Sequence, residues 1–151
     1  MRGEPSEERV TRVRIKAGGF EFLARLEDAD APQTCAVFRT MLPFQSRIIQ
    51  ARWSGEAAWI PLGNRQFDFG YENQTSRPSR GDILFYPGGI SEAEILFPYG
   101  TVSFGSKVGP LAGNHFLSIV EGQEDLARFG DKVLWEGAQD ILFELRDGPA
   151  V

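Results

Sequence analysis

The single histidine of the chain, His115, follows Asn114 at the start of an apolar run. An imidazole can donate a hydrogen bond to a ligand carbonyl or carboxylate, and its charge changes near neutral pH. A histidine at the start of a strand can equally bond only to the backbone. The sequence leaves these two interpretations of His115 equally open, so we treat it as a candidate ligand-binding residue.

A second set of chemically useful residues surrounds a turn in "ARWSGEAAWIP". Arg52 and Glu56 flank the turn, and Trp53 and Trp59 lie close by in sequence. An arginine beside a tryptophan can bind a carboxylate through two N–H donors while the ring stacks on a planar group. The alternative is an exposed ion pair with two core aromatic residues. We retain Arg52 and Trp59 as candidate ligand-binding residues.

Residues 63–80 are polar and rich in turn-forming residues, which predicts a long loop with at most one short strand. The loop carries Tyr71 and Glu72, and a polar cluster of this kind can line a pocket for a small molecule. The alternative is a solvated loop held by side-chain-to-backbone turns. We keep Tyr71 and Glu72 as candidates.

The stretch "YPGGISEAE" places Gly88 and Gly89 before Glu92 and Glu94. Two glycines allow a backbone to approach a ligand closely, although a hairpin turn explains the pair equally well. The stretch is no phosphate-binding P-loop, because no Gly-Lys-Ser/Thr follows.

The sequence predicts no metal site and no cofactor. One histidine and one cysteine, Cys35, are too few for a zinc site, and they lie far apart in the chain. His115 also has no evident serine or cysteine partner for nucleophilic catalysis. Cys35 lies on an apolar helix face and is expected in the core.

Two alternating stretches, 10–17 and 20–27, flank Gly18-Gly19 and predict a hairpin. Over 28–42 the period becomes helical, with Asp30 as the expected N-cap and Pro43 as the stop. Further strands are expected over 46–55, 56–63, 81–89, 92–100, 115–122 and 138–147, a short helix over 123–130, and extended chain over 131–137. We expect 102–114 to be irregular. About eight strands with two helices are typical of a closed barrel whose open ends are covered by helices.

Composition limits the class of protein. The chain has 151 residues, of which 42% are hydrophobic, and a net charge of -5. We expect a flexible N-terminus over 1–9 and one domain over 10–151. The acidic balance argues against nucleic-acid binding. The single cysteine favours a reducing compartment, and the sequence shows neither a signal peptide nor an apolar run long enough to span a membrane, so we expect a cytoplasmic protein.

Two segments resemble cyclophilins. "APQTCAVFRTML" is similar to their first helix, and "LAGNHFLSIVEGQEDL" is similar to a late segment that contains His115. The chain as a whole resembles an uncharacterised bacterial family with a cyclophilin-like fold. The resemblance implies a mostly β, closed barrel of about eight strands with two short helices. It also implies that Arg52 and the aromatic residue Phe104 lie in a groove with His115. The Gln-Gly-Gly-Asp turn of cyclophilins is missing after Arg52, and Pro110 replaces their tryptophan.

We therefore expect a binding module that holds a small polar or carboxylated metabolite, or a peptide, in a cleft on the barrel. The expected lining is Arg52, Trp59, Tyr71, Glu72, Phe104 and His115. One alternative is a weak or specialised peptidyl-prolyl cis-trans isomerase, and another is a structural subunit of a larger enzyme complex. The expected partner is the ligand, with no nucleic acid and no membrane, and a homo-oligomer is a further option.

Overall fold

The computed structural model describes residues 10–146. The expected flexible segment 1–9 lies outside the described residues, as do residues 147–151. The strands are β1 (Arg12–Ala17), β2 (Phe20–Leu26), β3 (Phe44–Gln50), β4 (Gly55–Gly63), β5 (Gln74–Thr75), β6 (Asp82–Tyr86), β7 (Ala93–Val102), β8 (Gly105–Ser106), β9 (Gly109–Pro110), β10 (Gly113–Glu121) and β11 (Gln139–Leu145). The helices are α1 (Pro32–Met41) and α2 (Leu126–Glu136), and a 3₁₀ turn (Gln123–Asp125) precedes α2.

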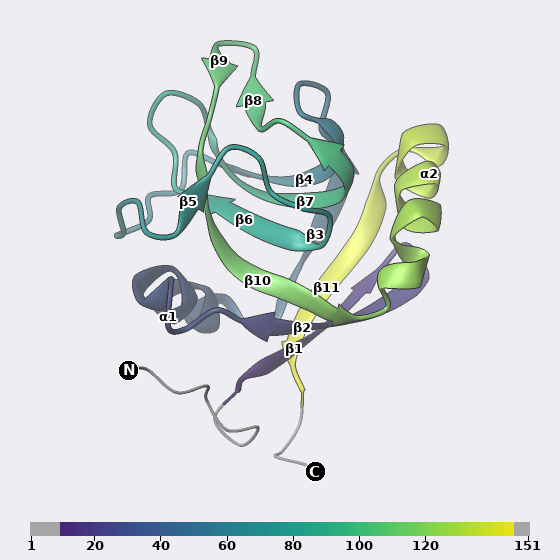
Figure 1. Ribbon diagram of the computed structural model, residues 1–151, viewed down its shortest axis with the longest axis horizontal. Coiled ribbons are helices and arrows are strands. Elements are labelled where there is room, and N and C mark those ends of the chain that lie inside the picture. The colour runs from purple at the N-terminus through teal and green to yellow at the C-terminus, as the bar shows by residue number, and fades with distance from the viewer. Residues whose placement is uncertain (1–9, 147–151) are drawn as a thin grey trace.

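Eight antiparallel strands form a closed barrel. They follow one another in the order β2-β1-β11-β3-β4-β7-β6-β10, and β10 pairs again with β2 to close the sheet. The short β5 adds to β10 beside β6, and β8 pairs only with β9 (Figure 1). The expected closed barrel of about eight strands with two helices is confirmed.

The first hairpin shows how local sequence sets the register. Gly18 and Gly19 both have positive φ, of 57° and 88°, a conformation that glycine adopts without steric cost. The turn pairs Ala17 with Phe20, and Val13 and Ile15 then point into the barrel. The charged residues between them point outward, as the alternation predicted.

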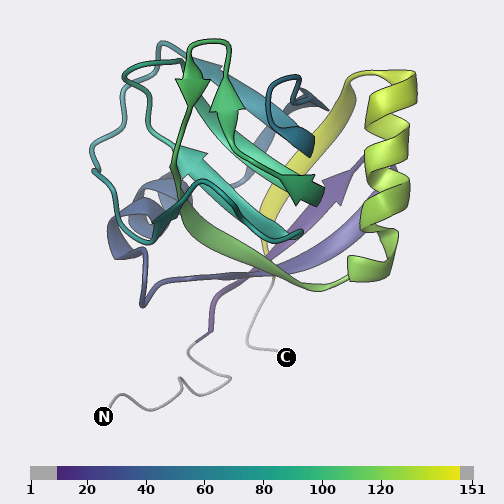
Figure 2. The ribbon, with the colours of Figure 1, turned by 45° about the horizontal axis from the view of Figure 1, so that its top comes forward.

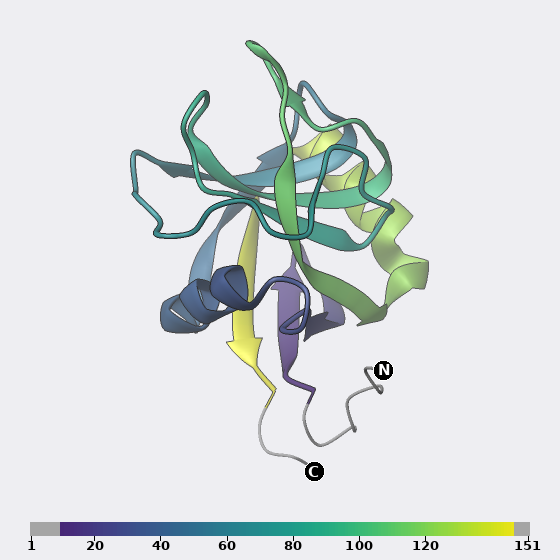
Figure 3. The ribbon, with the colours of Figure 1, turned by 60° about the vertical axis from the view of Figure 1, so that its left-hand side comes forward.

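The two helices lie on opposite sides of the barrel (Figures 1 and 3). Cys35 and Phe38 of α1 enter the core at one side, and Phe129 and Val133 of α2 enter it at the other. The Phe38 ring packs edge-on against Phe116 of β10, with centroids 4.9 Å apart. Each helix thus covers an open end of the barrel with its apolar face, as expected.

Three expectations about the elements need correction. The N-cap of α1 is Ala31 rather than Asp30. Residues 131–137, expected to be extended, belong mostly to α2, which continues through Gly130 to Glu136 (Figure 2). Residues 102–114 are not wholly irregular, because they contain β8 and β9. Neither α1 nor α2, the helices described within residues 10–146, is long and apolar enough to cross a membrane.

Candidate functional site

The sheet formed by β4, β7 and β6 carries a second apolar cluster on its outer face. Side chains alternate along each strand, so every second residue points away from the barrel interior. Trp59 of β4 lies opposite Leu96 of β7, and Leu96 lies opposite Leu84 of β6. We call this group the outer-face cluster; it comprises Ala51, Ala57, Leu84, Tyr86, Leu96, Val102, Phe104 and Leu111, with Trp59 packed against it.

Phe104 fills the outer-face cluster instead of lying open to solvent. Its side chain is 1% exposed, and its backbone N–H donates to the carbonyl of Ser76 at 2.8 Å. A Cβ on Gly113 would lie 3.1 Å from both the Phe104 ring and Leu84, so the ring packs against bare backbone. A ligand reaches Phe104 only if the residues that enclose its ring move.

Arg52 lies in the exposed turn between β3 and β4. Its guanidinium stacks on Trp53, 5.4 Å from the ring centroid, and Trp53 is itself 55% exposed. Arg52 forms no ion pair among residues 10–146. The stacked pair is therefore a feature of the surface, with Ala51 of the outer-face cluster as its neighbour in the chain.

Tyr71 and Glu72 are neighbours in the loop after β4 but differ in environment. Tyr71 is 59% exposed. The Glu72 carboxylate accepts bonds from both the backbone N–H and the hydroxyl of Thr34, and the Glu72 N–H donates to the Asn114 side chain. Glu72 therefore fastens the loop to the first turn of α1, where backbone N–H groups lack helical partners.

His115 belongs to a chain of polar side chains on β10. Its Nε2 lies 2.8 Å from the Ser118 hydroxyl, which donates to Glu27, and 3.6 Å from a carboxylate oxygen of Asp82. Because the Ser118 hydroxyl donates to Glu27, the imidazole Nε2–H donates to Ser118. The imidazole therefore bonds to side chains, and the backbone of His115 pairs with Asn73.

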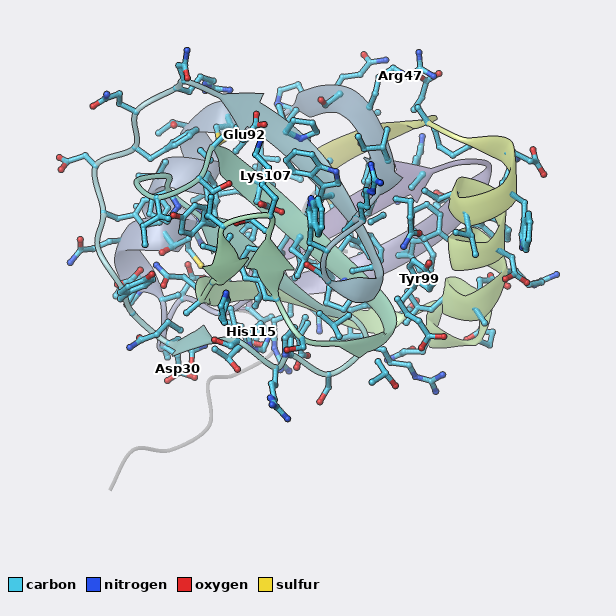
Figure 4. The ribbon with its side chains drawn as sticks, turned by 90° about the horizontal axis from the view of Figure 1, so that it is seen from above. Asp30, Arg47, Glu92, Tyr99, Lys107 and His115 are labelled. Carbon is cyan, nitrogen blue, oxygen red and sulfur yellow. The ribbon has the colours of Figure 1, made fainter. Side chains whose placement is uncertain are left out.

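The six candidate residues do not gather at one place on the barrel. Trp59 and Phe104 meet in the outer-face cluster. Glu72 belongs to the loop after β4 and His115 belongs to β10. The Glu72 N–H donates to the Asn114 side chain, and the Asn73 side chain donates to the His115 carbonyl. Seen from above, His115 and Glu92 of the β6–β7 turn lie on opposite sides of the molecule (Figure 4).

Glu94 is a site residue that the sequence did not single out. It is 5% exposed, and none of the side-chain hydrogen bonds or ion pairs within residues 10–146 involves its carboxylate. Burial, together with the nearby Glu92 carboxylate, raises its pKa to about 8. One acidic residue within the apolar stretch "AEILF" was the available signal, and its burial depends on tertiary structure.

A cleft of about 640 Å³ opens between the β6–β7 turn and the chain that follows β4. We call it the turn cleft; its lining is Gly63, Asn64, Arg65, Gln66, Phe67, Pro87, Gly88, Gly89, Ile90, Ser91, Glu92 and Ala93. The Arg65 guanidinium lies 5.1 Å from the centroid of the Phe67 ring. Glu92 closes one side, where its carboxylate accepts the N–H of Gly63 at 3.1 Å.

Within residues 10–146, no side chains are arranged for metal binding or for thiol chemistry. No group of three histidine, cysteine, aspartate or glutamate side chains within residues 10–146 is placed to hold a metal ion. Cys35 is buried, and burial raises the pKa of its thiol to about 12, with Asp28 adding to the effect. The thiol is therefore protonated at neutral pH and forms part of the core.

The family assignment follows from a match over most of the chain. A family model described as a protein of unknown function, DUF3830, matches residues 13–145. The chain belongs to the DUF3830 family. No curated protein matches this DUF3830 chain.

Solved structures show which fold the DUF3830 chain shares. McbB, in a structure with tryptophan, is 20% identical with a TM-score of 0.63; the match covers 92% of this chain and spans 46% of the McbB chain. The hypothetical protein AF2241 from Archaeoglobus fulgidus is 21% identical over 96% of this chain and 100% of its own, with a TM-score of 0.60. A cyclophilin-type peptidyl-prolyl cis-trans isomerase from Cryptosporidium parvum is 13% identical over 93% of this chain and 99% of its own, with a TM-score of 0.56. The expected uncharacterised family with a cyclophilin-like fold is confirmed.

Proposed function

We propose that this DUF3830 protein is a cytoplasmic binding module that holds a small carboxylated ligand in the turn cleft. The observation that carries the proposal is the Arg65 guanidinium, which stacks on Phe67 at the cleft wall. No acidic side chain within residues 10–146 forms an ion pair with Arg65. A planar guanidinium held against a ring presents paired N–H donors that match a carboxylate.

The size and lining of the turn cleft support a ligand of this kind. Its volume, about 640 Å³, lies within the range of small-molecule sites. Gly88 and Gly89 have φ of 99° and 129°, so one wall is bare backbone that a ligand can approach closely. Glu92 is held by the Gly63 N–H, which keeps its charge at the edge of the cleft.

One structure of similar fold is consistent with a carboxylated aromatic ligand. McbB was solved with tryptophan, which carries a carboxylate and a ring. The likeness to McbB concerns the fold, so tryptophan serves here as a probe for the turn cleft and not as an assigned ligand.

The isomerase alternative has weaker support. Proline would need access to Phe104, which is 1% exposed, and the Arg52 guanidinium stacks on Trp53 instead. For the third alternative, a structural subunit of a larger complex, no contact among residues 10–146 provides specific support. We therefore favour the binding module.

Titration of the protein with phenylacetate and tryptophan, followed by NMR, tests the proposal. We expect binding that shifts the backbone signals of Gly88 and Gly89, which line the cleft. Arg65→Ala should weaken it about tenfold or more, the equivalent of one lost charge-assisted pair.

The matched control is Arg80→Ala, which removes an exposed arginine from the same connection outside the cleft lining. We expect the control to bind like the wild type. Equal binding by Arg65→Ala, or shifts that centre on Arg52 and Trp53, would contradict the proposal.

A further inference from the structure

Glu94 lies on a different face of β7 from the turn cleft. Its neighbour Ala93 lines the cleft and belongs to the barrel core, and successive strand residues point to opposite faces. Glu94 therefore points to the outer face, where it lies between Tyr86 of β6 and Pro61 of β4.

The carboxyl group of Glu94 is almost buried, has no hydrogen-bond partner among the described residues and still reaches solvent. No donor within residues 10–146 bonds to it, although the residue is 5% exposed. No fully enclosed side-chain oxygen or nitrogen of the described residues lacks a hydrogen-bond partner. The Glu94 carboxyl oxygens have no partner in this part of the chain and therefore still touch solvent. The small exposed area of this residue thus includes its carboxyl group.

The structure gives Glu94 no stabilising role. A carboxyl group with so little exposure loses most of its hydration and gains no bond from the described residues in return, which costs free energy in the folded state. An apolar residue or a glutamine of similar volume would avoid the cost of the charge. A group kept at such a position is a candidate to interact with something outside the chain.

The surroundings of Glu94 favour a cation over other ligands. Tyr86 lies opposite Glu94 in the pairing of β6 with β7, and Trp59 is two residues from Pro61 on the same face of β4. Aromatic faces attract cations, and a carboxylate pairs with an ammonium most strongly where water is excluded. The carboxylate of Glu92 lies close enough to raise the pKa of Glu94, so a ligand anion would meet like charge.

The β6–β7 turn lies over this part of the outer face. The Tyr86 hydroxyl accepts the N–H groups of Ile90 and Ser91, at 3.1 and 3.3 Å, which draws the turn back over the end of β6. Gly88 and Gly89 precede these contacts with positive φ. The turn therefore limits the size of any ligand that reaches Glu94.

We propose that Glu94 anchors a second ligand site, on the outer face of the barrel beneath the β6–β7 turn, which binds the protonated amine of a small aromatic ligand. The site is separate from the turn cleft and does not depend on the function proposed for it. At neutral pH the carboxyl group gives up its proton when the ammonium binds, so binding releases a proton to the buffer.

The test uses 2-phenylethylamine as the probe, with 2-phenylethanol as its neutral counterpart. Calorimetry at pH 7 in buffers of different ionisation enthalpy gives both affinity and proton release, and the indole N–H signal of Trp59 reports the location by NMR. We expect the amine to bind at least about tenfold more tightly than the alcohol, to shift the Trp59 signal and to release protons.

Two variants decide whether Glu94 is the anchor. Glu94→Gln retains the shape of the protonated acid but cannot become negative, and we expect amine binding to fall about tenfold or more. Glu136→Gln removes an exposed carboxylate at the end of α2, outside the lining of either site, and we expect it to bind the amine as the wild type does. No amine binding to the wild type, equal binding of amine and alcohol, equal binding by Glu94→Gln, or binding without proton release would each overturn the proposal.

Discussion

The Glu72 carboxylate accepts two hydrogen bonds from Thr34, one from the backbone N–H at 2.6 Å and one from the hydroxyl at 2.7 Å. Thr34 is in the first turn of α1, and the two residues are 38 positions apart in the chain. The helix has no side-chain cap from its own N-cap residue, Ala31. A residue of the long loop therefore supplies the cap that the local sequence lacks.

Replacement of Glu72 should destabilise the protein. Glu72→Ala leaves the Thr34 N–H and hydroxyl without their shared acceptor, and we expect a loss of about 1–3 kcal/mol in the free energy of unfolding. Urea denaturation measures the change. Tyr71→Ala, at the exposed neighbouring position, is the control and should change stability by less than about 0.5 kcal/mol. An effect of Tyr71→Ala as large as that of Glu72→Ala would contradict this assignment.

Glu94 should make stability fall as pH rises. Its pKa is about 8 in the folded protein against 4.5 for the ordinary group, so the folded state binds more protons between these values. The contribution of Glu94 to the free energy of unfolding therefore decreases across that window, by up to about 5 kcal/mol. The other titratable groups near it are Glu92 and Tyr86.

The measurement is urea denaturation of wild type and Glu94→Gln at a series of pH values from 5 to 9. Glu94→Gln removes the ionisation without removing the volume, so its stability relative to the wild type should increase between about pH 5 and pH 8 and level off above pH 8. Glu136→Gln, at an exposed carboxylate of α2, is the control for loss of one negative charge. Parallel curves for wild type and Glu94→Gln would show that the carboxyl group titrates normally.

Gly130 should be intolerant of any side chain. A Cβ at this position would collide with the ring of Tyr99 on β7, so Gly130→Ala must displace the helix or the ring. We expect a cost of about 1–3 kcal/mol, measured by thermal or urea unfolding. In a Tyr99→Ala background the same substitution should cost much less, and additive effects in this double-mutant cycle would exclude the contact as the cause.

Prolyl isomerisation should not be accelerated. Because Phe104 is enclosed, we expect NMR exchange spectra of Xaa-Pro peptides to show the uncatalysed rate, with interconversion over tens of seconds or longer. Arg52→Ala should leave these spectra unchanged. Acceleration by the wild type that Arg52→Ala abolishes would instead establish the isomerase alternative.

Local patterns were sufficient for most of the fold. The Gly18-Gly19 hairpin and the apolar face of α1 depend on residues close together in sequence, and both were predicted. The second half of α2 was missed because Gly130 disfavours a helix in isolation. In the folded protein, Tyr99 packs where a Cβ would stand, and Phe129 and Val133 hold the helix against the core.

The sites depend on contacts that no local pattern contains. Trp59 and Phe104 belong to one cluster only because β4 pairs with β7 in this register and because the chain after β7 folds back onto the outer face. The role of Glu72 depends on Thr34, far away in the chain. Glu94 was noted only as part of a glycine-containing turn, because its burial comes from tertiary structure.

The pairing of β2 with β10 and of β1 with β11 has a consequence for protein synthesis. During synthesis, the β1–β2 hairpin has both of its edges exposed until residues 113–145 have been made. Unpaired strand edges are the surfaces through which nascent chains associate wrongly. Arg14, Lys16 and Glu21 point outward on this hairpin, and charged side chains on unpaired strands disfavour edge-to-edge association in that interval.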